Sequence, residues 1–484
     1  MWFPATVGVL IFFRTALYLY FVMSGGNYIH PDSALYLELA EHLIETGDFF
    51  LPSSQPDIIQ PFGIPSSQTM RILFSDVPAG PEIFRTPGYP VFLVVLHWLN
   101  IDNPYSIVLI QEIIYGVSIF IFYHYGQQLL NKNIMRAGVI FMLINSGGLV
   151  WPKFLISETL FLPFLIAGLL FIGLYLRHYQ VRFLIMAGVL LGIGGWIRPA
   201  IQYLPIVVAL IIVLFHFKSM KKWLHVTVFL LFFVLTLSPW LIRNYYHYGQ
   251  IFMSGQGSNL LANYHVPAVW HWPNVDQFDK SGQQLVQRKI KKIVVQKENE
   301  SGRSVDAVEF FKLQQNWALK ELSHYPVIYF KAWLAGAARV MYESFVNDFY
   351  QLMRFPDHRL HFLDVLTGNF KAYHSIKTTG IISGVVYYFL HQDRFYLFHT
   401  VFSMTVAIFA IFGAVSIVSK RDCFLWLIML TNFYFILLPG PIGYGRYRFP
   451  IDVFWFIQAC YGYMWIVGLV QSAQQKNIWK AVSD

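Results

Sequence analysis

The chain has 484 residues, of which 56% are hydrophobic and 13% charged, with 35 Lys and Arg against 26 Asp and Glu. The apolar residues occur in blocks too long for a soluble core, so the composition excludes a soluble globular enzyme and predicts a polytopic membrane protein. No run of basic residues indicates nucleic acid, because a basic surplus in short loops is what orientation in a bilayer produces.

Stretches close to 20 apolar residues, the length that crosses a bilayer, recur along the chain. They lack the period-two alternation of barrel strands, so we predict an all-α bundle. Two weaker segments, 326–344 and 378–392, raise the count to about 10–12 spans, and either could instead lie along the interface. The ten main spans are expected at 4–23, 105–124, 134–150, 155–175, 182–197, 200–217, 223–241, 397–418, 423–439 and 449–470.

Short loops predict the orientation and the organisation of the chain. The loops at 131–136, 177–182, 218–222 and 419–421 carry clustered Lys and Arg, which predicts that they are cytoplasmic. The opening span has no basic segment and no cleavage site before it and is expected to be retained. We predict an N-terminal transmembrane module (1–243) with an external loop at 24–104 that folds as one or two helices, an external helical cap (244–325), and C-terminal transmembrane helices (326–484).

Asp32 stands at the head of an amphipathic stretch, "IHPDSALYLELAEHLIETGDFF" (29–50), directly after the first span. Leu35 and Leu39 recur with helical spacing and predict a helix lying in the membrane interface. Two interpretations of Asp32 stay open. It is the N-cap of this helix, or it is a functional carboxylate, which would need cationic partners on the same face.

Arginines occur in several of the other predicted external turns. Any one of them could snorkel to the headgroups, but this face should be depleted in positive charge. An arginine cluster there indicates an anion site, and the planar guanidinium favours phosphate. The arginines are Arg85 in "FRTPGYPVF", Arg198 in "WIRPA", Arg243 in "SPWLIRNYYHYG", and Arg446 and Arg448 in "GYGRYRFP", where Tyr444 and Tyr447 accompany them.

Glu158 lies at the external end of an apolar span, in "WPKFLISETLFLPFLI" (151–166). An ionisable residue at that depth is a functional candidate, although it could merely complement the helix dipole. Arg14 and Glu112, inside other spans, are expected to pair with each other. A cavity with arginines and a carboxylate suits group transfer from a phosphate-bearing lipid, with arginine stabilising the leaving phosphate and the carboxylate accepting a proton. Glycine-rich nucleotide loops are absent, which argues against a nucleotide-activated donor.

The ordered motifs resemble the GT-C superfamily of polyprenyl-phosphate-sugar-dependent membrane glycosyltransferases, especially the branch with protein O-mannosyltransferases and the aminoarabinose transferase of lipid A. The motifs are "PDSALYLELAEHLIETGDF", "RTPGYPVFL", Pro152 with "SETL", "IRPA", "PWLIRN" and "RYRFPID". They occur along nearly the whole chain, in the same order as in the family. The resemblance implies a GT-C bundle with external interfacial helices and an active site on the external, periplasmic side of a bacterial-type inner membrane.

The resemblance also implies residue roles. Asp32 and Glu158 are the expected catalytic carboxylates, with Asp32 as the base that activates the acceptor. Arg85 and Tyr89 belong to the motif that contacts the lipid phosphate. Many members have a second acid directly after the first-loop aspartate, where Ser33 stands here, so no metal site is assigned, no cofactor is named, and a divalent metal is left open. Further donor-phosphate residues are expected among Arg198, Arg243, Arg446, Tyr447 and Arg448.

We therefore predict a glycosyltransferase that moves a monosaccharide from a polyprenyl-phosphate carrier, such as undecaprenyl phosphate, to a lipid, glycan or protein acceptor. One alternative is a lipid-linked sugar flippase or transporter, which should show interrupted helices or an inverted repeat; the sequence shows neither. The other is a polymerase or ligase of lipid-linked oligosaccharides, which should carry its long loop late in the chain.

Overall fold

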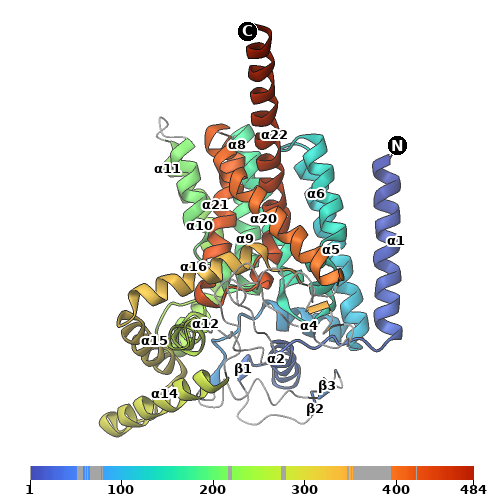
Figure 1. Cartoon of the computed structure of the whole chain (residues 1–484). Coiled ribbons are helices and arrows are strands. Elements are labelled where there is room, and N and C mark those ends of the chain that lie inside the picture. Colours follow the sequence, from blue (N-terminus) through green and yellow to red (C-terminus); the bar gives the residue numbers. More distant parts are fainter. Residues whose placement is uncertain are drawn as a thin grey trace.

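The computed structural model is built almost entirely of helices (Figure 1). It describes residues 2–51, 58–59, 62, 64–65, 78, 80–215, 221–273, 280–345, 348–349, 352, 394–420 and 422–483. The α-helices are α1 (Trp2–Met23), α2 (Ser33–Thr46), α4 (Gly88–Trp98), α5 (Pro104–Gly126), α6 (Lys132–Ile144), α7 (Ser146–Val150), α8 (Ser157–His178), α9 (Val181–Ile197), α10 (Leu204–Phe215), α11 (Lys221–Tyr248), α12 (Gln256–Leu260), α13 (Val266–Trp270), α14 (Lys280–Ser301), α15 (Ala307–Ser323), α16 (Pro326–Tyr342), α20 (Arg394–Lys420), α21 (Cys423–Leu437) and α22 (Asp452–Ser483).

Short elements connect these helices. The 3-10 turns are η1 (Trp151–Lys153), η2 (Pro199–Ile201), η5 (Gly440–Ile442), η6 (Gly445–Tyr447) and η7 (Phe449–Ile451), and η3 (Leu261–His265) is a π-helical turn. In the described part of the chain, the strands form two antiparallel pairs of two residues each. They are β1 (Phe50–Leu51) with β4 (Gly80–Pro81) and β2 (Ile58–Ile59) with β3 (Ile64–Pro65).

The predicted spans coincide with apolar helices. Among the described residues, six helices are long and apolar enough to cross a membrane: α1, α5, α8, α11, the α20 stretch Leu397–Lys420, and Gly445–Ser472, which includes most of α22. The other predicted spans correspond to the bent pair of α6 with α7–η1 and to the shorter apolar helices α9, α10 and α21. The predicted all-α fold of an integral, polytopic membrane protein is confirmed.

Three details differ from the sequence expectations or lie beyond them. The weak segment 326–344 is helix α16, which has 17 residues, whereas 378–392 lies outside the described residues. The sequence shows no interrupted helix, yet α6 and the segment Ser146–Lys153 are bent by 46°. Asn145 stands at this break, as the C-cap of α6 and the N-cap of α7.

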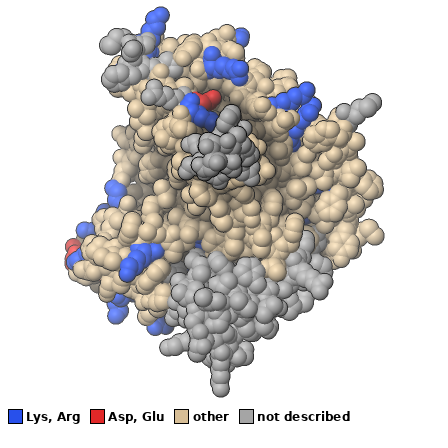
Figure 2. Space-filling model, turned by 45° about the horizontal axis from the view of Figure 1, so that its top comes forward, with Lys and Arg blue, Asp and Glu red and all other residues tan. Residues whose placement is uncertain are grey.

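Both chain ends lie at one end of the bundle, and α2, α12, α14 and α15 gather at the opposite end (Figure 1). Turned so that the end with the termini comes forward, the surface shows several Lys and Arg side chains and few acidic ones (Figure 2). This distribution agrees with the basic loops used to predict a cytoplasmic end. We call the end with α2 and α14 the cap end.

Close helix contacts depend on glycine. A Cβ atom on Gly413 of α20 would lie 1.9 Å from the carbonyl oxygen of Gln458, and one on Gly462 of α22 would lie 1.8 Å from that of Phe409. Neither position has room for a side chain, so the two backbones approach as small residues allow in membrane helix pairs. This contact places the start of α22, which follows η6 and η7.

A buried ion cluster ties the broken helix to the bundle. Glu112 on α5 accepts from Arg14 of α1 and from Lys153 of η1, both at 2.6 Å. Arg14 also donates to the carbonyl of Gly148 at 2.7 Å, and Lys153 to that of Leu149 at 2.8 Å. The expected pairing of Arg14 with Glu112 is confirmed, and Lys153 is a third member that the sequence analysis did not include.

Replacing Glu112 with Gln is expected to destabilise the protein by about 3–5 kcal/mol, because two buried cations lose their carboxylate. Thermal unfolding in detergent micelles measures the effect. The matched control is Glu309→Gln, which breaks the pair of Glu309 with Arg303, an arginine that is 62% exposed; its cost should stay below about 1 kcal/mol. Equal shifts for the two variants would contradict this account of the cluster.

Helix α2 lies between two hydrophobic clusters. Its side chains Tyr36, Leu37 and Ala40 belong to the core of the bundle, whereas Leu35 and Leu39 belong to a second core with residues of α14 and α15. Glu38 and Glu41, which the pattern places on the polar face of the helix, are also buried. The cap thus packs on Leu35 and Leu39, the leucine face that the sequence pattern predicts for the membrane interface.

The polar region predicted as a cap contains helices α12 to α15 in its described part. The second core joins them to the first external loop through Ile83 and Phe84, which pack with Phe310 and Phe311 of α15. The described residues of the first external loop include the helices α2 and α4. The division of the chain at 243 and 325 stays a prediction.

Candidate active site

The carboxylate of Asp32 is shared between two arginines that are distant in the sequence. Arg85 Nη2 donates to Asp32 Oδ1 at 2.7 Å, and Arg446 Nη2 lies 2.6 Å from Asp32 Oδ2. Arg85 comes from the loop before α4, and Arg446 comes from η6, before α22. The fold thus brings three of the residues selected from the sequence into direct contact.

Glu158 forms the second half of the same cluster. It lies fully buried in the first turn of α8, and its Oε1 is 2.5 Å from Nη1 of Arg198, which ends α9. Arg446 Nε donates to this same oxygen. Arg446 therefore joins both carboxylates, and we call Asp32, Arg85, Glu158, Arg198 and Arg446 the arginine cluster.

Asp32 occupies the N-cap position of α2, but its side chain makes no capping hydrogen bond. Neighbouring groups close the turn instead. The N–H of His30 donates to Ser33 Oγ at 3.0 Å, and the N–H of Ser33 donates to the His30 carbonyl at 2.8 Å. The capping interpretation is therefore correct for the position of Asp32 and wrong for its carboxylate, which faces the arginines.

The arginine cluster contains three guanidiniums and two carboxylates, so its cations exceed its anions by one. Burial disfavours the charge on Asp32, but Arg85 and Arg446 outweigh burial and hold its pKa well below the usual range. Two polar atoms of the cluster, Arg85 Nε and Glu158 Oε2, are buried without a hydrogen-bond partner. A site with surplus positive charge and an unused donor suits an anion.

Several residues around the cluster were not selected from the sequence. Tyr36 lies four residues after Asp32, hence on the same helix face; its hydroxyl is 3.3 Å from Arg85 Nη1 and 3.0 Å from Ser157 Oγ. Arg446 stacks 5.6 Å from the ring of Trp151. The helical spacing of Tyr36 was a signal that the sequence contained, whereas Trp151 carried none.

Two further residues act on the cluster from outside it. The buried Glu82 accepts from the backbone N–H groups of Phe84 at 2.5 Å and Arg85 at 2.6 Å, which fixes the loop that carries Arg85. Burial raises the pKa of the Tyr264 hydroxyl, and the charge of Asp32 adds to this effect. Tyr264 belongs to η3, the π-helical turn of the cap.

Three residues assigned to the donor phosphate have polar groups that are hydrogen-bonded to other partners. Tyr89 is buried, and its hydroxyl donates to Gln111 Oε1 at 2.6 Å. Arg448 donates to Asp452 Oδ1 at 2.6 Å and to the Glu343 carbonyl at 3.0 Å. Arg243 is described below. Tyr447 is half-buried beside Arg446 in η6, and its phosphate-binding role stays a prediction.

Arg243 holds the first external loop. It donates to the carbonyl of Phe49 at 2.7 Å and to that of Glu82 at 2.6 Å, and it stacks 4.9 Å from the ring of Trp240. The carbonyls belong to the two chain segments that pair as β1 and β4. Arg243 therefore connects α11 to the loop that presents Arg85.

Replacing Arg243 with Gln is expected to lower the free energy of unfolding by about 2–3 kcal/mol, since hydrogen bonds from a charged donor are lost. Thermal unfolding measures this loss, and the affinity for a lipid phosphate measured in parallel should change less than in an Arg85→Gln variant. A variant of parental stability with a large loss of lipid-phosphate affinity would instead support the donor contact predicted from the sequence.

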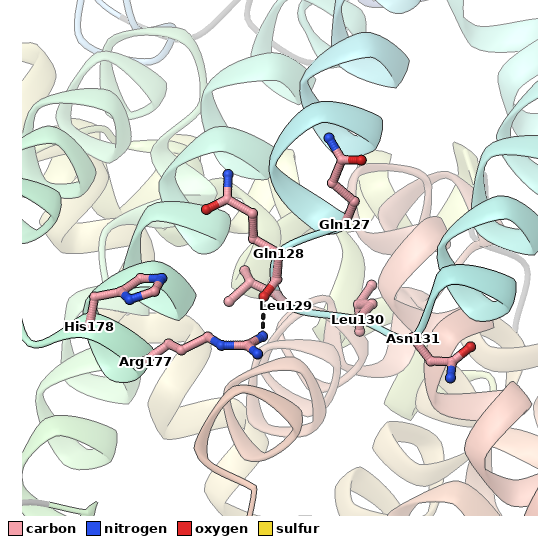
Figure 3. A pocket seen from close by; sticks show the side chains of 7 residues that line it. All are labelled: Gln127, Gln128, Leu129, Leu130, Asn131, Arg177 and His178. Carbon is pink, nitrogen blue, oxygen red and sulfur yellow. Dashed lines mark hydrogen bonds between the residues drawn. The ribbon is translucent and has the colours of Figure 1, made fainter.

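A separate hollow of about 530 Å³ lies at the other end of the bundle (Figure 3). It is lined by Gln127, Gln128, Leu129, Leu130, Asn131, Arg177 and His178. Arg177 donates to the carbonyl of Gln128 across it. No residue of the arginine cluster takes part. In the part of the chain that the structure describes, no group of three His, Cys, Asp or Glu side chains is arranged to hold a metal ion.

Comparison with solved structures finds similar helical membrane proteins. ArnT from Cupriavidus metallidurans in the apo state is 12% identical, with a TM-score of 0.35, over 95% of this chain and 78% of ArnT. The same protein bound to undecaprenyl phosphate is 10% identical, with a TM-score of 0.36, over 94% and 77%. The apo oligosaccharyltransferase of Archaeoglobus fulgidus is 11% identical, with a TM-score of 0.49, over 99% of this chain and 52% of the oligosaccharyltransferase. This chain thus aligns with about half the length of the archaeal enzyme.

Comparison with protein families gives a match in sequence. No curated protein matches the chain. Residues 85–242, about a third of the chain, match the family described as dolichyl-phosphate-mannose-protein mannosyltransferase. The matched segment begins at Arg85, contains Glu158 and Arg198, and ends just before Arg243. The resemblance of this chain to the GT-C membrane glycosyltransferases of the protein mannosyltransferase branch is therefore confirmed, on a match that covers residues 85–242.

Proposed function

We propose that this protein is a membrane glycosyltransferase that transfers a monosaccharide from a polyprenyl-phosphate donor to a lipid, glycan or protein acceptor at the cap end. The observation that carries the proposal is the Asp32 carboxylate shared by Arg85 and Arg446. A carboxylate is an anion of the same hydrogen-bonding type as phosphate. The site therefore already holds an anion where the donor phosphate would bind.

Transfer needs two things that the cluster supplies, which are cations for the leaving phosphate and a base for the acceptor proton. The acceptor oxygen or nitrogen attacks the anomeric carbon, the bond from that carbon to the phosphate oxygen breaks, and its electron pair stays on the phosphate. Arg85 and Arg446 stabilise the negative charge that grows on the phosphate. Asp32 takes the proton from the attacking acceptor. The products are the glycosylated acceptor and the free polyprenyl phosphate.

The low pKa of Asp32 beside Arg85 and Arg446 makes it a weak base. A bound phosphate would compete with Asp32 for the hydrogen bonds of Arg85 and Arg446. Because those two cations hold the pKa down, losing part of their contact raises the pKa of Asp32 toward its ordinary value. Donor binding would thus make the base stronger at the moment when it is needed.

Glu158 has a supporting role in this proposal. It is fully buried and holds Arg198 and Arg446 through one oxygen. A carboxylate in that position orients Arg446 toward the phosphate and offsets part of its charge. We therefore assign the proton transfer to Asp32 and assign to Glu158 the placement of the arginines.

The test is a transfer assay with purified protein in lipid nanodiscs. A panel of undecaprenyl-phosphate monosaccharides is supplied with total membrane lipid or peptide as acceptor, and the released undecaprenyl phosphate is measured. We expect release with at least one sugar, abolished in Arg85→Gln and retained in the control Arg182→Gln, at the other end of the bundle. Release from none of the donors, with the folded protein intact, would exclude the proposed reaction.

We further propose that the cap end is the external, periplasmic face of a bacterial-type inner membrane. The clustered basic residues of the loops at the opposite end support this orientation. Labelling of a cysteine introduced at exposed Gln127, from each side of sealed vesicles, tests it. Reaction from the periplasmic side alone would reverse the proposed orientation.

A further inference from the structure

His30 lies beside the arginine cluster, although the sequence analysis assigned it no role. It precedes α2 in the turn that carries Asp32, and its side chain is only 12% exposed. The imidazole lies edge-on to the rings of Trp151 and Phe154, with centroid distances of 6.0 and 5.7 Å. The ring is therefore held in one place beside the residues that we propose to act on the donor.

The backbone of Asp32 determines the tautomer of this histidine. The N–H of Asp32 donates to Nδ1 of His30 at 3.2 Å. Nδ1 must therefore carry a lone pair and no proton, and a neutral ring then carries its proton on Nε2. The hydrogen bonds between His30 and Ser33 hold the same turn closed, so the ring and the carboxylate keep their relative position.

Arg446 lies against the face of this ring. Its Nη1 is 3.4 Å from Nδ1 and 3.4 Å from Nε2 of His30. A point in the ring plane at equal distance from both nitrogens would overlap other ring atoms, so the guanidinium nitrogen lies above the plane. A neutral aromatic face attracts an N–H group that points at it, whereas a protonated imidazole would repel the guanidinium.

The charged groups that face His30 also favour the neutral ring. Burial lowers its pKa most, and Arg446 lowers it further. Asp32 and Glu158 act in the opposite direction, and Arg85 again lowers the pKa, which comes to about 3. The folded-state pKa is below the ordinary value, so the ring stays neutral through the range in which histidines usually titrate.

We propose that His30 is a positioning residue whose neutral imidazole holds the Asp32 backbone with Nδ1 and supports the Arg446 guanidinium with its face. One ring thus positions both the base, Asp32, and the phosphate-binding cation, Arg446, of the proposed reaction. The effect of His30 on sugar transfer rests on the proposed function, whereas its tautomer and contacts do not.

Two substitutions separate the two contacts. His30→Asn places an amide oxygen near the position of Nδ1 and removes the ring face, so we expect a kcat within about twofold of the parent and a donor KM raised about tenfold. His30→Phe keeps a ring face and removes the acceptor, so we expect kcat to fall about tenfold with little change in KM. His97→Asn is the control, because His97 pairs with Asp102 at the end of α4, outside the cluster; both constants should stay parental.

The two variants contradict the proposal if both constants shift by the same factors in each, or if neither constant shifts in either.

Nitrogen-15 NMR of the imidazole gives a readout that does not depend on sugar transfer. We expect a signal of the tautomer with protonated Nε2 that is missing in His30→Asn and constant between pH 5 and 8. Titration near the ordinary histidine pKa, or a proton on Nδ1, would overturn the proposal whatever the activity. The expected NMR signal in a protein that releases no polyprenyl phosphate would support the geometry and sink only the proposed function.

Discussion

Replacing Asp32 with Asn is expected to lower kcat for sugar transfer by about 10²–10⁴-fold, the range lost when a general base is removed. The amide keeps the size of the side chain and one hydrogen-bond acceptor, so the protein should still fold. It leaves Arg85 and Arg446 without their shared charge, which costs about 1–3 kcal/mol of stability. Release of undecaprenyl phosphate by the variant, measured beside its thermal unfolding, separates the two effects.

The pH dependence follows from the same carboxylate. The pKa of Asp32 in the free protein lies well below its usual range, so its contribution to stability is complete above the unfolded pKa of about 4 and is lost only as the pH falls through the lower, folded pKa. We therefore expect no acidic limb in kcat/KM between about pH 5 and 7, because kcat/KM reports groups of the free enzyme. A limb near pH 6 in the parent that disappears in Asp32→Asn would refute this assignment. Parental kcat in Asp32→Asn would remove Asp32 from catalysis altogether.

Arg446 and Arg448 provide the second large contrast, because they are two residues apart in the chain and have different surroundings. Arg446 contacts Asp32 and Glu158. Arg446→Gln is expected to lower transfer by about 10²–10³-fold, the loss seen when one donor to a developing negative charge is removed. Its unfolding temperature should change less than that of the matched variant at Arg448.

Arg448 is the matched variant. It is buried and donates to Asp452 and to carbonyls at the end of α16, including that of Glu343. Arg448→Gln should lower the free energy of unfolding by about 3–5 kcal/mol, because Asp452 is left as a buried carboxylate without a cation, with a hydrogen bond from Asn145. The fraction that stays folded should bind undecaprenyl phosphate with parental affinity. Loss of lipid binding in Arg448→Gln with parental stability would restore the role expected from the sequence and contradict the contacts described above.

The different surroundings of these two arginines explain why the candidate site was only partly predictable. A topology argument assigns a residue to one side of the membrane, but it does not say where in the plane of that side the residue lies. Arg446 and Arg448 flank Tyr447 at the end of a 3-10 turn, in which successive residues point about 120° apart. Two arginines in "RYR" therefore face different neighbours, and which one reaches Asp32 depends on how α22 packs against α6, α20 and α21.

Arg243 and Tyr89 show the same limit. The sequence pattern predicts both residues on the external side, where a donor site is expected. Arg243, however, donates to carbonyls of the first external loop, and the Tyr89 hydroxyl donates to Gln111. Buried backbone carbonyls and side-chain amides need partners as much as a ligand does. The sequence does not show these competing partners, because they come from distant segments.

The sequence by itself determined the all-helical membrane fold, since long apolar blocks have few ways to satisfy their backbone in lipid. It also indicated functional candidates, because an ionisable residue at the depth of a membrane span is a functional hypothesis. They include Asp32, Arg85, Glu158, Arg198 and Arg446. Only the tertiary structure decided that these five meet, that α2 is covered on both faces, and that His30 supports the cluster. The reason is that apolar periodicity records burial along one helix, whereas a site depends on the packing of helices far apart in the chain.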